Sequence, residues 1–365
     1  MPRIKTPPPR GSDVKGLRAK TRPVSSRSKH LHPRRELTPR APDHSATRER
    51  ARRRGRIRVG TASWTDPGFV ADWYPRKLPA AERLRWYAEH LDLVEVNSTF
   101  YAVPSQSVVA GWSSQTPKGF LFDVKLHRLL SRHSTPVNQL PRGLRAKART
   151  NKRGRVAVTP KLEEGLVEVF LEAVEPLVDS GKLGALLLQL SPSFGPRDHS
   201  LHELDHLLDL LKGHEVAVEL RNRGWVTGEH EPETIVYFRK RRVALAGVDA
   251  PRNSHFMIVP DFDIVTDRHL AYLRAHGRNV RGYFSGRTVA ERFDYDYSNK
   301  ELGEIAKRAA KLAGLASEAH VIFNNNKSSY APSAAIRFRQ IVAERFGGAR
   351  RPERSSAPGA MKNPG

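Results

Sequence analysis

The residues of this sequence that are best suited to chemistry stand at the ends of short apolar runs. Glu95 and Asn97 alternate with Val94 and Val96, so a carboxylate and an amide share one face of a predicted strand. Other runs end in acids, bases and amides, and this wider set is Lys125, His127, Gln189, Glu219, Arg221, Asp249, Arg274, His276, Arg278, Asn324 and Asn325. Because buried charge is costly unless it is paired, so many polar groups on apolar strands need an explanation.

The chemistry that these groups allow is proton transfer beside a bound anion. We predict Glu95, Glu219 or Asp249 as a general base, and His276 as an acid or base. Arginine and lysine bind phosphate or carboxylate, and amides suit hydroxyl groups. The predicted ligand-binding residues are Asn97, Lys125, Gln189, Arg221, Arg274, Arg278, Asn324 and Asn325. The expected ligand is therefore phosphate-bearing or otherwise anionic, with phosphoester hydrolysis as the reaction if the protein is an enzyme.

Three alternatives remain open for the same residues. A nitrogen–oxygen metal site is the first, with His127, Glu219, Asp249 and His276 as its ligands. No His-x-His spacing supports it and nearby cations would repel a metal ion, so we predict no cofactor and keep a divalent metal as the less favoured alternative. Glycoside hydrolysis by Glu219 and Asp249 is the second, and the surplus of cations disfavours it. A paired structural network is the third; it is the favoured explanation for any single residue, and a ligand site is favoured for the whole set.

The elements that must position these residues alternate between strand and helix. The predicted strands are 57–62, 93–97, 120–125, 184–190, 216–221, 243–249, 270–276 and 320–323, and the predicted helices are 79–90, 107–115, 162–178, 201–211, 234–241, 298–312 and 334–346. Eight such repeats favour a TIM-type (β/α)8 barrel, whose sites lie at the carboxyl ends of the strands. The segment 131–160 is basic and has little apolar periodicity, so it is predicted as a surface excursion.

The charge of the chain is concentrated at its ends. Residues 1–56 hold 18 Lys or Arg against 4 acids, which is +14 of the formal +25, and they contain few large apolar side chains. We predict that 1–56 and 347–365 are disordered tails flanking one barrel domain, 57–346. The basic tail, with the excursion and the strand-end cations, also allows a non-catalytic nucleic-acid-binding protein.

Composition excludes several other classes of protein. There is no cysteine, so disulfides and thiol nucleophiles are excluded. No run of about 18 apolar residues or apolar signal core is present, so we expect a cytoplasmic protein without a membrane partner. The oligomeric state does not follow from the sequence.

A set of short motifs also resembles a known family. In chain order they are Gly60-Thr61-Ala62-Ser63-Trp64, Glu95-Val96-Asn97-Ser98-Thr99-Phe100-Tyr101, Val218-Glu219-Leu220-Arg221, His276-Gly277-Arg278, Phe323-Asn324-Asn325-Asn326 and Tyr330-Ala331-Pro332. Over 57–346 the chain is similar to the YecE-like family, or domain of unknown function 72. The resemblance implies a TIM-type barrel and brings no established reaction. The sequence departs from the family in the basic segment 131–160 and at Ser63, where glycine is usual and serine tolerates positive φ less well.

Overall fold

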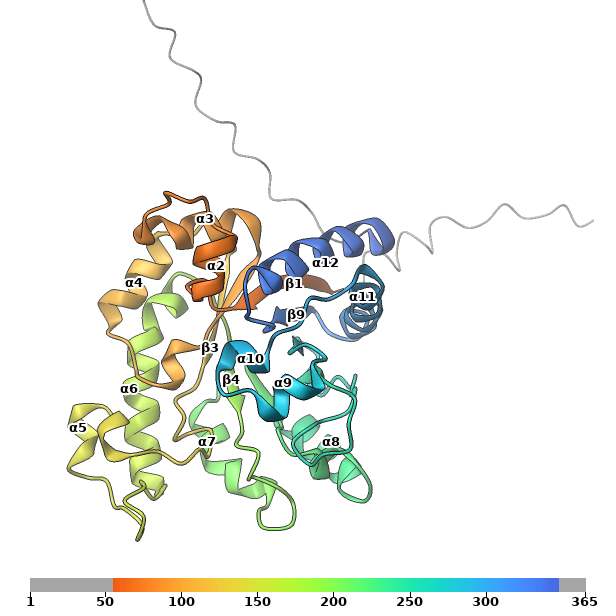
Figure 1. Cartoon of the computed structure of the whole chain (residues 1–365). Helices are drawn as coiled ribbons and strands as arrows, with labels where there is room; N and C mark the ends of the chain where they lie inside the picture. Colours follow the sequence, from red (N-terminus) through yellow and green to blue (C-terminus); the bar gives the residue numbers. More distant parts are fainter. Residues whose placement is uncertain (1–54, 348–365) are drawn as a thin grey trace, which may run out of the picture. The chain divides into compact units, whose positions relative to one another are not determined.

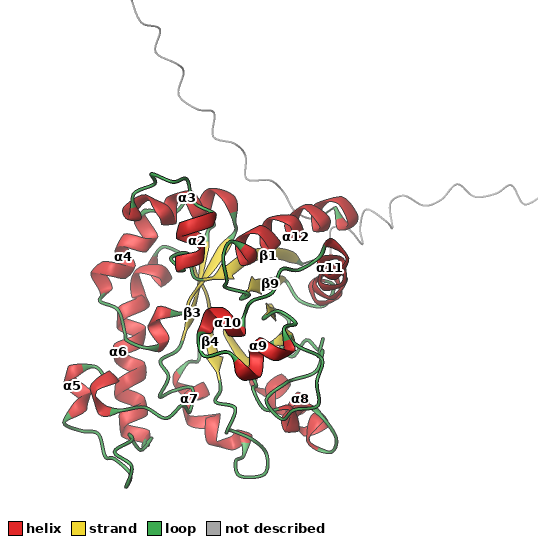
Figure 2. Cartoon of the chain, in the orientation of Figure 1, coloured by secondary structure: helices red, strands yellow, loops and turns green. Residues whose placement is uncertain are grey.

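The computed structural model describes residues 55–347, in which nine parallel strands form one sheet surrounded by helices (Figure 1, Figure 2). The strands are β1 (Arg56–Ala62), β2 (Leu93–Val96), β3 (Leu121–Lys125), β4 (Leu183–Gln189), β5 (Val216–Glu219), β6 (Ala244–Leu245), β7 (Gly247–Asp249), β8 (Leu270–Ala275) and β9 (Glu318–Phe323). Their order in the sheet is β6-β5-β4-β3-β2-β1-β9-β8-β7. The predicted tails lie outside the described residues, apart from positions 55, 56 and 347.

The barrel closes through the run 244–249, which pairs with a neighbour on each side. In this run β6 pairs with β5 and β7 pairs with β8. Between them, the amide of Ala246 donates to the carbonyl of Val218. The predicted strand 243–249 is therefore split in two, which gives nine strands in residues 55–347 where eight were expected. The TIM-type barrel predicted from the alternation of elements is confirmed.

The helices form the outer layer of the barrel (Figure 2). Their bounds are α2 (Pro67–Asp72), α3 (Arg83–His90), α4 (Gln106–Ser114), α5 (Arg142–Arg145), α6 (Pro160–Asp179), α7 (Asp205–Leu210), α8 (His230–Arg241), α9 (Val280–Ser285), α10 (Val289–Arg292), α11 (Asn299–Ala313) and α12 (Tyr330–Phe346). Ser298, the first residue of the predicted helix 298–312, caps α11 through a reciprocal capping box with Glu301. No helix within residues 55–347 combines the length and the apolar character that crossing a membrane requires.

Backbone packing explains one residue of the first motif. Strand β1 lies beside β2, with Gly60 paired to Leu93. A Cβ atom at Gly60 would lie 2.1 Å from the carbonyl oxygen of Leu93. Only glycine fits this approach, so Gly60 sets how closely the first two strands meet.

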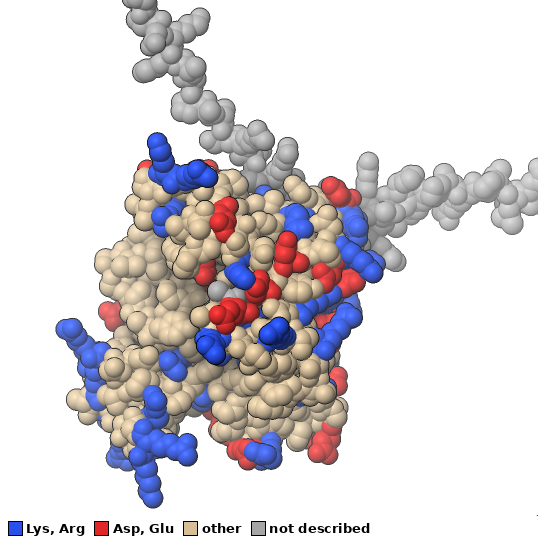
Figure 3. Space-filling view, in the orientation of Figure 1, with Lys and Arg blue, Asp and Glu red and all other residues tan. Residues whose placement is uncertain are grey.

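Besides α2, for which no helix was predicted, two longer segments carry more structure than their sequences predicted. The excursion 131–160 contains α5 and an antiparallel bridge between Pro136 and Arg155, and it buries Leu140 and Leu144. Basic side chains project at the lower left of the face in Figure 3, where α5 lies in Figure 1. Between β8 and α11, α9 and α10 occupy a stretch for which no element was predicted. Polar side chains weaken the apolar periodicity of both segments, so the sequence pattern did not predict these short helices.

Candidate functional site

The carboxyl ends of the strands open into a cavity of about 450 Å³. Six of the predicted site residues line it: Asn97, Lys125, Gln189, Arg221, Arg274 and Asn324. They come from β2, β3, β4, β5, β8 and β9 or from the residue or two after each strand. Because parallel strands in a barrel end at the same rim, positions far apart in the sequence meet here.

The floor of the cavity is an arginine held between two buried glutamates. Arg274 donates two hydrogen bonds to Glu95, from Nε to Oε2 at 2.8 Å and from Nη2 to Oε1 at 2.5 Å. Its Nη1 donates to Glu219. All three side chains are buried. The guanidinium therefore compensates two carboxylates at once, and it does so by the bidentate geometry that arginine favours.

Glu219 is the centre of a wider hydrogen-bond network. Its Oε1 accepts from Gln189 Nε2 at 2.9 Å and lies 3.2 Å from His276 Nε2. On the other side of the imidazole, Asn324 Nδ2 is 2.9 Å from His276 Nδ1. Burial alone would raise the pKa of Glu219, but Arg274 and His276 hold it well below its usual range. Burial lowers the pKa of His276, so a charged glutamate faces a neutral histidine.

Lys125 stands above this floor in an unusual position for a lysine. Its Nζ donates to Gln189 Oε1 at 2.7 Å and lies 4.5 Å from the centre of the Phe100 ring. Burial and, to a smaller extent, the positive charge of Arg274 lower the pKa of Lys125 to about 7, against the opposing effect of Glu95. The amine is therefore partly uncharged near neutral pH.

Further cavity residues were not predicted from the sequence. They are Asp66, His133, Tyr283, Arg292 and Asn326. Asn326 directly follows the predicted residues Asn324 and Asn325, so the run of three asparagines in the sequence could have identified it. Asp66 stands in the turn-rich loop after β1 and accepts a hydrogen bond from Asn326 Nδ2 at 2.9 Å. Burial raises the pKa of Asp66 to about 6.

Two carbonyl oxygens at the cavity have no hydrogen-bond donor among the described residues. They are Oδ1 of Asn97 and Oδ1 of Asn326, and both are buried. An unpaired buried acceptor is costly, so both atoms are suited to accept from a hydroxyl or amine group of a ligand. At the cavity edge Ser63 has φ 110°, a backbone conformation that glycine adopts more readily than serine.

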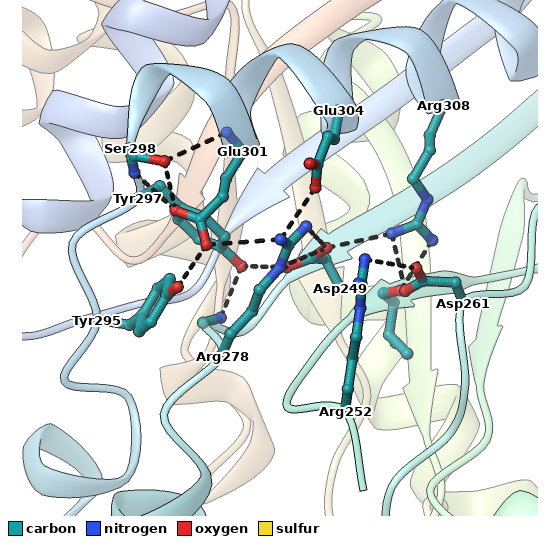
Figure 4. Close-up of polar contacts among 12 residues, drawn as sticks. Asp249, Arg252, Asp261, Arg278, Tyr295, Tyr297, Ser298, Glu301, Glu304 and Arg308 are labelled. Atoms are coloured by element: carbon teal, nitrogen blue, oxygen red, sulfur yellow. Dashed lines mark hydrogen bonds and ion pairs between the residues drawn. The ribbon is translucent and has the colours of Figure 1, made fainter.

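Asp249 and Arg278 lie outside this cavity network (Figure 4). Arg278 donates to both oxygens of Asp249, at 3.0 Å from Nε and 2.8 Å from Nη2. Asp249 also accepts from Tyr297 at 2.7 Å, and it pairs with Arg308 of α11. Arg278 reaches Glu304 on the same helix. These contacts join β7 to α11, so the structure gives both predicted site residues partners in the helical layer.

His127 and Asn325 also point away from the cavity floor. His127 Nε2 is 3.1 Å from the carbonyl of Gln139, within the excursion. Asn325 donates to the carbonyl of Tyr295 at 2.8 Å. Residues 55–347 contain no group of three His, Asp or Glu side chains arranged to hold a metal ion. The four residues considered as metal ligands are thus divided among three places, namely His127, Asp249, and the Glu219–His276 pair.

Comparison with known proteins places the chain among relatives of the same fold. The family model described as "Protein of unknown function DUF72" matches residues 58–358. The "UPF0759 protein YunF" of Bacillus subtilis (strain 168) is 24% identical over 296 residues, which are 80% of this chain and 96% of the relative. The "UPF0759 protein YecE" of Escherichia coli (strain K12) is 29% identical over 180 residues, or 49% of this chain and 53% of the relative.

Solved structures agree with this result. A crystal structure of a DUF72 family protein from Enterococcus faecalis V583 is similar with a TM-score of 0.63 and 26% identity, covering 78% of this chain and 95% of that one. A DUF72 family protein from Thermotoga maritima MSB8 is also similar with a TM-score of 0.63 and 26% identity, covering 79% and 99%.

Proposed function

This chain belongs to the DUF72 family of proteins of unknown function, as its motifs predicted, and from its site we propose that it binds a small phosphate-bearing or otherwise anionic ligand in the cavity at the carboxyl end of the barrel. The observation that carries this proposal is the charge of the cavity wall. Four cationic side chains line it, and Asp66 is the one acidic residue among its described lining residues. The cations are Lys125, Arg221, Arg274 and Arg292.

These cations differ in how far the protein already neutralises them. Arg274 is fully occupied by Glu95 and Glu219. Arg221 lies 3.6 Å from Glu219 and donates to the hydroxyl of Tyr283. Within residues 55–347, neither Lys125 nor Arg292 has a carboxylate oxygen within ion-pair distance. Lys125, Arg221 and Arg292 are therefore the groups that a ligand anion would engage.

The size of the cavity and its remaining lining suit a small molecule. A volume of about 450 Å³ lies in the range of pockets for small ligands. Phe100, Tyr283 and Phe293 supply apolar surface around the polar groups. Because Lys125 is buried inside the barrel mouth, it is poorly placed to reach the phosphates of a duplex. Nucleic-acid binding by the basic tail stays a prediction, since that tail lies outside the described residues.

We limit this proposal to binding because hydrolysis has weaker support. A general base must accept a proton, and Glu219 is stabilised in its charged form by Arg274. Glu95 gives both oxygens to the same guanidinium. His276 keeps a neutral ring, but both of its nitrogens already have partners, Glu219 and Asn324. Phosphoester hydrolysis would have to break one of these contacts.

The proposal is tested by isothermal titration of the full chain with inorganic phosphate, sulfate and a sugar phosphate. We expect Arg221→Gln to weaken binding about 10- to 100-fold, because a hydrogen bond to a charged group contributes about 1.5–3 kcal/mol. The matched control is Arg197→Gln, whose side chain is 90% exposed in the loop before α7. Equal affinities for the two variants, or no binding of any of the three anions to the unmodified chain, would contradict the proposal.

A further inference from the structure

The side chain of Lys125 has an environment that charge pairing does not explain. A buried lysine is normally stabilised by a carboxylate or by several hydrogen-bond acceptors. Lys125 has a hydrogen bond to one amide oxygen, that of Gln189, and it faces the ring of Phe100. A cation–π contact stabilises an ammonium less than a carboxylate would. The site therefore tolerates the amine without fixing it in its charged form.

A second buried lysine shows what a structural role looks like in this chain. Lys182 has the same exposed fraction as Lys125, 8%. Its Nζ donates three hydrogen bonds, to the carbonyls of Ser113 at 2.6 Å and Thr116 at 2.7 Å and to the Thr116 hydroxyl at 3.1 Å. All of its protons have acceptors, and it does not line the cavity at the barrel mouth. Lys125, with its one acceptor, is the buried lysine that this cavity exposes to a ligand.

The neighbouring amide is oriented so that its oxygen accepts one hydrogen bond from Lys125. Gln189 donates from Nε2 to Glu219 at 2.9 Å, which turns its Oε1 toward Lys125 at 2.7 Å. An amine donates one proton to this oxygen and keeps its lone pair available on the side of the cavity. The orientation of Gln189 is held from below by Glu219, which Arg274 fixes in turn.

Five titratable groups surround Lys125, and four of them are charged near neutral pH. Arg274 on β8 and Arg221 after β5 disfavour its ammonium form, whereas Glu95 on β2 and Glu219 on β5 favour it. His133 of the excursion lines the same cavity, and its own pKa is lowered to about 4 by burial and by Lys125, so it adds no charge near neutral pH. Amines placed beside cations in apolar surroundings are the ones that enzymes use as nucleophiles.

We propose that Lys125 is a nucleophile that condenses with the carbonyl group of an anionic aldehyde or ketone held in the barrel-mouth cavity. This inference rests on the proposed function, because Arg221 and Arg292 would hold the anionic group of the same ligand. It names the ligand class as a carbonyl compound bearing a phosphate or carboxylate. The two unpaired amide oxygens of Asn97 and Asn326 would accept from its hydroxyl groups.

The reaction is a reversible condensation. The Nζ lone pair forms a bond to the carbonyl carbon while the π pair moves to oxygen, and a proton passes from nitrogen to that oxygen to give a carbinolamine. Its hydroxyl accepts a proton from solvent and leaves as water, which produces a protonated imine on Lys125. Addition of water reverses the sequence, so no oxidant or reductant is required.

The test is reductive trapping on the unmodified full chain. Glyoxylate, pyruvate or dihydroxyacetone phosphate is added, sodium borohydride then reduces any imine to a stable amine, and peptide mass spectrometry locates the adduct. We expect Lys125 to carry the adduct at more than tenfold higher occupancy than Lys182. Half-maximal trapping is expected near pH 7, where the uncharged fraction of Lys125 exceeds that of an ordinary lysine about 10³-fold.

Lys125→Arg tests the chemical step, because arginine cannot form the imine. We expect this variant to lose the adduct. Phosphate affinity is measured on the unmodified chain, which separates this inference from the proposed function. No adduct on Lys125 with any of the three probes, in a chain that binds phosphate, would overturn the inference and leave the proposed function standing. No phosphate binding and no adduct would overturn both. Mass spectrometry of the unmodified chain decides the matter even if the variant fails to fold.

Discussion

The imidazole of His320 provides a quantitative test of how charge is held inside the barrel. It lies on β9, with Nδ1 3.0 Å from Asp123 and Nε2 3.3 Å from Glu318. Burial disfavours the imidazolium, but the two carboxylates favour it more strongly and raise the pKa of His320 to about 9. We therefore expect a charged histidine in the folded protein at neutral pH.

The sign of the pH effect follows from comparison with the unfolded chain, in which histidine has a pKa of about 6.5. Between about pH 6.5 and 9 the folded protein binds more protons than the unfolded chain, so the free energy of unfolding decreases as the pH rises. The contribution of His320 is complete below pH 6.5 and is lost by the time the pH has passed about 9. The difference between the two pKa values corresponds to a contribution of about 3 kcal/mol to the free energy of unfolding.

The assay is urea unfolding at a series of pH values between about 6 and 9.5, for the unmodified chain and for His320→Gln. We expect the free energy of unfolding to fall by about 3 kcal/mol more across this pH range in the unmodified chain than in the variant. His202→Gln serves as the control, because the side chain of His202 is 78% exposed. Parallel stability curves for the unmodified chain and His320→Gln would refute the reasoning, since they would mean that His320 is uncharged in the folded state.

Three further predictions concern the cavity and its floor. Arg274→Met leaves Glu95 and Glu219 buried without their cation, so we expect the free energy of unfolding in urea at pH 7 to fall by about 3–5 kcal/mol. A decrease of less than about 1 kcal/mol would contradict the pairing. Sulfate affinity is expected to rise several-fold between pH 7 and 5, as Asp66 with its pKa of about 6 loses its charge and Lys125 with its pKa of about 7 becomes fully charged. Calorimetry should find a smaller rise in Asp66→Asn, and an equal rise would contradict the contribution of Asp66. Ser63→Gly relieves the backbone strain of φ 110° but removes the hydrogen bond from the Thr65 amide to the Ser63 hydroxyl. We expect the free energy of unfolding in urea to rise by about 0.5–1 kcal/mol, and a decrease would contradict the assigned strain.

The architecture could be predicted because it depends on local patterns. Apolar strands alternating with amphipathic helices indicated the barrel, and the serine before α11 marked where that helix begins. The split at Ala246 could not be predicted, since it depends on which neighbour each part of the run pairs with. Side-chain alternation places Lys125 correctly but fails for His127, because β3 ends at Lys125 and period 2 holds only within a strand.

The partners within the site were beyond the reach of sequence patterns. Glu95 and Arg274 were both candidates, yet nothing in the sequence around either residue indicates that they bind each other across 179 positions. Asp249 and Arg278 show the same limit, because their pairing depends on β7 lying beside β8 (Figure 4). A strand-end position therefore indicates which residues are near the rim, and the tertiary packing decides which of them face the cavity.

The wide sequence separation of the buried ion pairs has a consequence for the folding of this barrel. Glu95 and Asp123 belong to the first strands of the chain, whereas Arg274 and His320, their partners, belong to the last ones. A half-barrel that folded alone would bury charges whose counterions lie in the other half, and this is strongly unfavourable. We therefore expect that neither half is stable as an independent folding unit.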